Sequence, residues 1–170
     1  SKTKIIAVTH LSNVTGTIVP IKEIVEIARK KNIPVLVDGC QSAPHIKIDV
    51  LDLDCDFYAF SGHKVYGPTG VGILYAKRKW LEKLPPYIGG GAMISEVKKN
   101  KITYAPLPEK YEAGTMPTAE VVAFNESIKF MHSVGIENII KHEKELTNYT
   151  LEKLKKINSV KIIGNPKNKA

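Results

Sequence analysis

The sequence has only two cysteines, Cys40 and Cys55, among its 170 residues. They form no C-x-x-C pair and no spacing typical of a metal site, so the pattern indicates neither a zinc site nor a disulfide framework. We expect two reduced, packed thiols, which suits a reducing compartment. A chain of this length can bury one sizeable core without disulfides or metal ions.

Long apolar runs are also missing. No stretch reaches the roughly 20 residues that a membrane-spanning helix needs, and no signal-peptide pattern opens the chain. The hydrophobic content of 43% and charged content of 25% are typical of a soluble globular domain, so no membrane partner is expected. The chain does not begin with Met and runs almost at once into a strand-like segment, which indicates a piece of a longer chain.

Arginine is scarce, since Arg29 and Arg78 are the only two arginines. The net charge of +8 therefore comes almost entirely from lysines scattered along the chain. Phosphate and base recognition favours arginine, and no nucleic-acid-binding motif is present. We expect a solvated lysine-rich surface and no nucleic-acid partner.

The hydrophobic pattern predicts alternating strands and helices. Residues 4–9 and 34–37 are short apolar runs, and residues 20–32 between them have helical periodicity with proline at the start. Strand, helix and strand in this order form a parallel, right-handed crossover. Residues 57–60 and 71–76 predict two further strands, joined by a turn too short for a crossover helix, and therefore antiparallel. The expected fold class is α/β, with a mixed, mostly parallel sheet flanked by helices.

Beyond this sheet the pattern is helical, with one exception. Residues 78–84 predict a short helix that ends at two prolines, and residues 117–134 and 136–157 predict two long amphipathic helices. Residues 87–116 show little periodicity, and a loop of that length is usually functional or mobile.

The domain division follows from these helices. We expect residues 1–134 to form the core of a ligand-binding domain. Residues 135–170 would contain a linking helix and the start of a second, truncated domain, with residues 160–163 beginning its first strand.

Polar groups follow three of the predicted strands, in residues 10–13, 38–41 and 61–64. Ligands of open α/β sheets bind beyond the carboxyl ends of the strands, so these turns predict one crevice. A buried Lys64 would have a lowered pKa and could attack an aldehyde. A buried Asp38 needs a cation such as a protonated pyridine nitrogen, although an aspartate here could also cap a helix.

Ser61 and His63, beside glycine backbone amides, suit a phosphate. His10 has no such role and is expected to be a packed side chain. Together, an amine, a carboxylate and a phosphate site match the needs of pyridoxal 5′-phosphate.

Four segments of the chain resemble the cysteine desulfurases of the class V aminotransferase family, with the SUF-type (group II) branch as the nearest match. They are VDGCQSAPH (37–45), LDCDFYAFSGHKVYGPTGVGILY (53–75), PPYIGGGAMI (85–94) and YEAGT (111–115). The similarity runs from about residue 4 to about residue 160. It implies the large domain of a fold type I pyridoxal-phosphate enzyme.

The resemblance also implies roles for individual residues. Lys64 would be the catalytic lysine, which forms the Schiff base and moves protons at the substrate carbon. Asp38 would pair with the pyridinium nitrogen, and Gln41 would bind the phenolic oxygen with Asn13 near the same edge.

The phosphate group has its own set of residues in the family. Ser61 and His63 would bind the phosphate, while Thr115, with Gly114 beside it, would reach the phosphate of a neighbouring subunit. That role implies a homodimer with shared active sites.

Two functional groups of the family have no counterpart here. The cysteine that carries the persulfide and the arginine that binds the substrate carboxylate lie in the family's C-terminal part, and Cys40 and Cys55 match other positions. The resemblance implies a parent enzyme that desulfurates L-cysteine for iron–sulfur cluster assembly and passes sulfur to an acceptor protein. Because these two groups are missing, the chain alone is expected to be inactive.

Other functions and locations remain open. A selenocysteine lyase and a cysteine-sulfinate desulfinase would share this machinery, and the chain could also be a non-catalytic fragment that only binds cofactor or dimerises. A bacterial cytoplasm and an organellar matrix are both compatible with the sequence.

Overall fold

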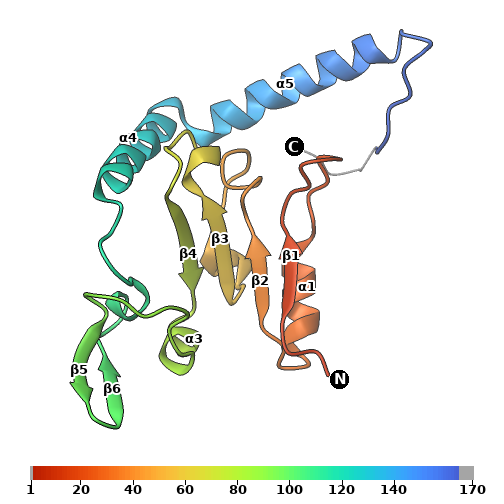
Figure 1. Cartoon of the computed structure of the whole chain (residues 1–170). Coiled ribbons are helices and arrows are strands. Elements are labelled where there is room, and N and C mark those ends of the chain that lie inside the picture. Colours follow the sequence, from red (N-terminus) through yellow and green to blue (C-terminus); the bar gives the residue numbers. More distant parts are fainter. Residues whose placement is uncertain (1, 165–170) are drawn as a thin grey trace.

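The computed structural model describes residues 2–164, and a four-stranded sheet forms its centre (Figure 1). The strand order is β1-β2-β3-β4, with the first three strands parallel and the last antiparallel to β3. The strands are β1 (Ile6–Thr9), β2 (Val35–Asp38), β3 (Phe57–Ser61) and β4 (Gly72–Ala76). This arrangement confirms the predicted mixed, mostly parallel sheet and the antiparallel pairing at its end.

Helix α1 (Ile21–Arg29) makes the crossover from β1 to β2. Its buried residues Ile21, Val25 and Ala28 lie on one helical face, as their spacing predicts. They form one apolar core with side chains of the strands and the loop before β3, namely Val35, Val37, Cys55 and Tyr58. Burial of this apolar face is what holds a helix of only nine residues in place.

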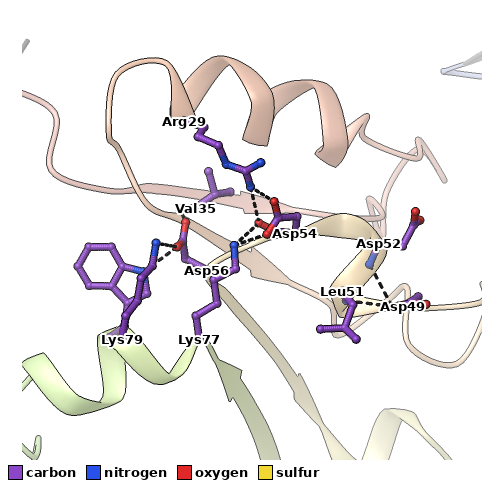
Figure 2. Close-up of polar contacts among 10 residues, drawn as sticks. Arg29, Val35, Asp49, Leu51, Asp52, Asp54, Asp56, Lys77 and Lys79 are labelled. Atoms are coloured by element: carbon purple, nitrogen blue, oxygen red, sulfur yellow. Dashed lines mark hydrogen bonds and ion pairs between the residues drawn. The ribbon is translucent and has the colours of Figure 1, made fainter.

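Two aspartates tie α1, β3 and the start of α3 (Arg78–Lys83) together at the amino-terminal edge of the sheet (Figure 2). Asp54 pairs with Arg29 and Lys77. Asp56 is buried and accepts hydrogen bonds from Trp80 Nε1 at 2.6 Å and from the backbone of β2 at 3.1 Å. Nearby, α2 (Val50–Leu53) begins at Asp49, whose Oδ1 accepts two backbone N–H groups of the first turn.

A hairpin of β5 (Ile94–Lys98) and β6 (Lys101–Tyr104) occupies part of the stretch that the sequence predicts as an irregular loop. That prediction is wrong for these residues. All nine strand residues are exposed, so neither strand shows the apolar and polar alternation of a half-buried sheet. The short 3₁₀ helix η2 (Glu109–Tyr111) follows the hairpin.

Two long helices complete the described chain, α4 (Thr118–Val134) and α5 (Ile136–Leu154), joined at Gly135 with φ 84°. Both helices confirm the sequence prediction, and α5 runs across the sheet at the carboxyl ends of β1, β2 and β3 (Figure 1). Within residues 2–164, none of the helices is both long enough and apolar enough to cross a bilayer.

Among residues 2–164, the expected strand at residues 160–163 is not formed, and no strand of either sheet pairs with this segment. The division at residue 134 stays a prediction. The last part of the second predicted domain, residues 165–170, lies outside the described residues.

Candidate active site

Three polar turns meet at the carboxyl-terminal edge of the sheet, as the sequence predicts. Thr9 at the end of β1 is in register with Asp38 at the end of β2, and Asp38 is in register with Ala59 in β3. Cys40 Sγ lies 3.7 Å from Ser61 Oγ, so the turns after β2 and β3 are in contact. The edge therefore brings the carboxylate of Asp38 to the same end of the sheet as the turn of residues 61–64.

The Asp38 carboxylate is exposed and holds its own turn in shape. One oxygen, Oδ1, accepts a hydrogen bond from the backbone N–H of Cys40 at 2.9 Å. Among the described residues the carboxylate has no cationic partner. Asp38 therefore caps a turn rather than a helix and keeps the capacity to pair with a cationic ligand.

Asn13 and Gln41 line one cavity of about 360 Å³ between the strand ends and α5. The cavity is bounded on the side of α5 by Glu143 and Thr147. The structure thus brings together the two amide side chains that the resemblance implies at one edge of a ligand.

Lys64 and His63 are exposed on the 3₁₀ turn η1 (Gly62–Lys64), so the expectation of a buried lysine is wrong for the described chain. The inward positions of this turn are Gly62 and Val65, both buried. A Cβ atom on Gly62 would lie 2.8 Å from a methyl carbon of Val71, so only glycine lets the turn pack this closely. Lys64 therefore projects from an anchored turn.

A buried polar network supports the turn that begins with Asp38. The Tyr58 hydroxyl lies 2.6 Å from Ser42 Oγ and 3.5 Å from His10 Nδ1, and all three side chains are buried. Burial raises the pKa of Tyr58 to about 12 and lowers the pKa of His10, which favours the uncharged form of each. His10 is a packed side chain, as expected. Sequence reasoning missed Tyr58, because in a buried strand it resembles any apolar core residue.

Gly114 and Thr115 follow the 3₁₀ helix η2 and precede α4. The Gly114 N–H donates to the carbonyl of Gly91 at 2.9 Å, and Gly114 has φ 86°. Thr115 is exposed, and within the described chain it forms no hydrogen bond with the turns at the strand ends. Within residues 2–164, no hydrogen bond joins these two residues to the other predicted site residues.

The groups at the strand ends fit the chemistry of pyridoxal phosphate. An exposed amine can reach an aldehyde, and an unpaired carboxylate can accept a protonated ring nitrogen. A hydroxyl and an imidazole beside a 3₁₀ turn suit a phosphate. No group of three metal-ligating side chains occurs among residues 2–164.

Known proteins are similar to this chain in both sequence and fold. The family model described as aminotransferase class-V matches residues 1–170. A probable cysteine desulfurase of Halalkalibacterium halodurans is 49% identical over 163 residues, which are 96% of this chain and 40% of that protein. The chain thus spans about 40% of the length of the curated relatives that it matches.

Two solved structures have the same fold. The cysteine desulfurase CsdA of Escherichia coli superposes with a TM-score of 0.87 at 38% identity, covering 91% of this chain and 39% of that one. A C-DES mutant with glycine covalently linked to its pyridoxal-phosphate cofactor gives a TM-score of 0.86 at 27% identity, over 96% of this chain and 44% of that one.

Proposed function

Because this chain belongs to the class-V aminotransferase family, we propose that it is the central part of a pyridoxal-phosphate-dependent cysteine desulfurase. The whole enzyme would convert L-cysteine to L-alanine and pass the sulfur on as a persulfide for iron–sulfur cluster assembly. The observation that carries this proposal is the register of Asp38 with Ala59 in β3, which puts Asp38 at the same sheet edge as the turn of residues 61–64. The likeness to cysteine desulfurases supports it.

Lys64 is the proposed catalytic residue. Its amine would bind the cofactor aldehyde, and after release by the substrate it would move a proton at the substrate α-carbon. Pyridoxal phosphate supplies an electron sink for the negative charge at that carbon. The exposure of Lys64 on an anchored turn supports this role, since the lysine must be reachable by the cofactor.

The neighbouring side chains would hold the cofactor. Asp38 would keep the ring nitrogen protonated by pairing with it. Gln41 and Asn13 would face the phenolic edge, and their common cavity supports that placement. Ser61 and His63 would bind the phosphate beside the backbone of η1.

Thr115 and Gly114 would complete the phosphate site of a second subunit. A homodimer with shared sites is consistent with their bonding, because among residues 2–164 neither residue forms a hydrogen bond with the turns at the strand ends. The positive φ of Gly114 would bring the backbone close to the partner's ligand without side-chain clash.

The sulfur-carrying cysteine would lie outside this chain. Cys55 has no exposed surface, and burial raises the pKa of its thiol, which disfavours the nucleophilic thiolate. Cys40 is half-buried against Ser61. Neither thiol is therefore assigned the persulfide that the whole enzyme would pass to a sulfur acceptor protein.

The test is an assay of the full-length protein, loaded with pyridoxal phosphate and given L-cysteine and a thiol reductant. Equal release of alanine and sulfide is expected. Lys64→Ala should reduce turnover by about 1,000-fold or more, as loss of a catalytic group does. Lys31→Ala, at an exposed position after α1, is the matched control and should retain full activity.

The same assay separates the alternatives. Preference for selenocysteine or cysteine sulfinate over cysteine would identify a selenocysteine lyase or a desulfinase. No turnover of any of the three would favour a non-catalytic protein. A bacterial cytoplasm is the proposed location, which cell fractionation tests.

A further inference from the structure

Helix α5 is fastened to the sheet edge by a contact between residues 98 positions apart in the chain. His45 Nδ1 lies 2.9 Å from one carboxylate oxygen of Glu143 and 3.1 Å from the other. The side chains are only 34% and 29% exposed, so water screens the pair less than it screens a surface ion pair. A carboxylate can only accept, so His45 Nδ1 carries the proton and donates it.

A second polar contact links the same two segments and provides a comparison. Lys47 Nζ lies 4.0 Å from Glu137 at the start of α5, with side chains 76% and 72% exposed. Exposed pairs of this geometry contribute little to stability, typically about 0–1 kcal/mol. Of these two contacts within residues 2–164, the pair of His45 and Glu143 is therefore the one better shielded from water.

The position of His45 connects this contact to the proposed cofactor site. The backbone of residues 39–46 forms helix-like turns, in which Ala43 N–H bonds to Gly39 and Ile46 N–H to Ser42. Residues four apart in such turns share one face, so Gln41 and His45 point to the same side. Both side chains line the cavity of about 360 Å³ that also contains Asn13.

Glu143 bounds that cavity from the other side. It lies on α5, which runs across the carboxyl ends of β1, β2 and β3 (Figure 1). Any shift of α5 along the sheet edge would pull on His45 and, through the same turn, on Gln41.

We propose that His45 and Glu143 are a positioning pair for the cofactor site. By holding α5 against the turn of residues 39–46, they fix Gln41 in the cavity that it shares with Asn13, where the phenolic edge of pyridoxal phosphate would lie. They touch neither substrate nor cofactor in this role. The inference rests on the proposed function, and it makes the cofactor site depend on the position of α5.

The experiment compares variants of the full-length protein, prepared as apoenzyme and titrated with pyridoxal phosphate. The test variants are His45→Ala, Glu143→Ala and the double variant, with Lys47→Ala and Glu137→Ala as matched controls from the exposed pair. The readouts are the dissociation constant for the cofactor, the visible absorption maximum of the bound form and the melting temperature of the apoenzyme.

Each test variant should raise the dissociation constant about fivefold or more, the lower end of typical coupling between sites. The absorption maximum should shift as well, since the contact at the phenolic edge is altered. The double variant should be no worse than either single variant, because both remove one interaction. The controls should change the constant by less than about twofold. His45→Gln keeps a donor and should recover part of the loss.

Unchanged cofactor affinity and absorption in the test variants would overturn the inference, even if the apoenzyme melts at a lower temperature. Additive losses in the double variant would also contradict it. If the unsubstituted protein itself fails to bind pyridoxal phosphate at Lys64, the proposed function fails and this inference fails with it. The behaviour of the unsubstituted protein thus separates the two failures.

Discussion

The backbone of Gly39 lies directly against the ring of Tyr58, where a Cβ atom on residue 39 would be 2.1 Å from ring carbon Cε1. Gly39 follows Asp38, and Tyr58 lies in the core beneath the turn. The close approach therefore concerns the residue that directly follows the Asp38 carboxylate. The ring cannot retreat easily, because its hydroxyl is hydrogen-bonded to buried Ser42.

We predict that Gly39→Ala displaces this turn and destabilises the protein. Overpacking of a core costs about 1–3 kcal/mol, and pyridoxal-phosphate affinity should fall with it because Asp38 moves. Chemical denaturation and cofactor titration measure the two effects. Gly89→Ala is the matched control, because a Cβ atom there meets nothing within 4 Å, and it should change stability by less than about 0.5 kcal/mol. Equal behaviour of the two variants would contradict the steric explanation.

Asp56 predicts a pH-dependent contribution to stability. Burial alone would raise the pKa of Asp56, but hydrogen bonds from Trp80 and Val35 and the nearby Lys79 lower it overall. A lowered folded-state pKa stabilises the protein above the unfolded-state pKa of about 3.9, and this contribution disappears as the pH falls through the folded-state value.

Asp56→Asn should therefore cost about 2 kcal/mol or more at about pH 7, because charge-assisted hydrogen bonds are lost. The difference from the unsubstituted protein should shrink below about pH 4. Urea denaturation across this range measures it, with the exposed Asp52→Asn as control. A difference that stays constant with pH would show that the charge of Asp56 is not involved.

Tyr111 anchors the segment that leads to Gly114 and Thr115. Its hydroxyl lies 2.8 Å from the carbonyl oxygens of both Leu81 and Leu84, at the end of α3, where helix carbonyls lack partners within the helix. Tyr111→Phe should lower the free energy of unfolding by about 1 kcal/mol. Hydrogen exchange of residues 112–116 should become faster.

Tyr87→Phe is the control for this prediction, since Tyr87 is 98% exposed. It should leave both stability and exchange unchanged. Identical exchange in the Tyr111 and Tyr87 variants would mean that the hydroxyl of Tyr111 does not hold the segment.

The central sheet could be predicted from the sequence because its signals are local. Val35 and Val37 are buried, and the short connection from β3 to β4 leaves room only for an antiparallel pair. Helix α1 likewise follows from the spacing of its three buried residues. The hairpin of β5 and β6 gave no such signal, since all its residues are exposed and Lys99-Asn100 is not a typical hairpin turn.

The candidate site was predictable only in part. Strand ends could be located from the sequence, so Asp38 and Ser61 could be assigned to one edge of the sheet. The contact of His45 with Glu143 could not be predicted, because no local sequence pattern relates residues so far apart in the chain. The prediction that Lys64 is buried was wrong. The apolar runs on either side of its turn suggested burial, but within the turn Gly62 and Val65 are the buried residues and Lys64 is exposed.

The most direct test of the central claim is a borohydride trap of the cofactor. The full-length protein is mixed with pyridoxal phosphate, reduced and digested, and the modified peptides are identified by mass spectrometry. We predict one dominant pyridoxyl group, on Lys64, and its loss in Lys64→Ala but not in Lys31→Ala. Label spread over many surface lysines, with Lys64 not favoured, would contradict the assignment of Lys64 as the cofactor-binding residue.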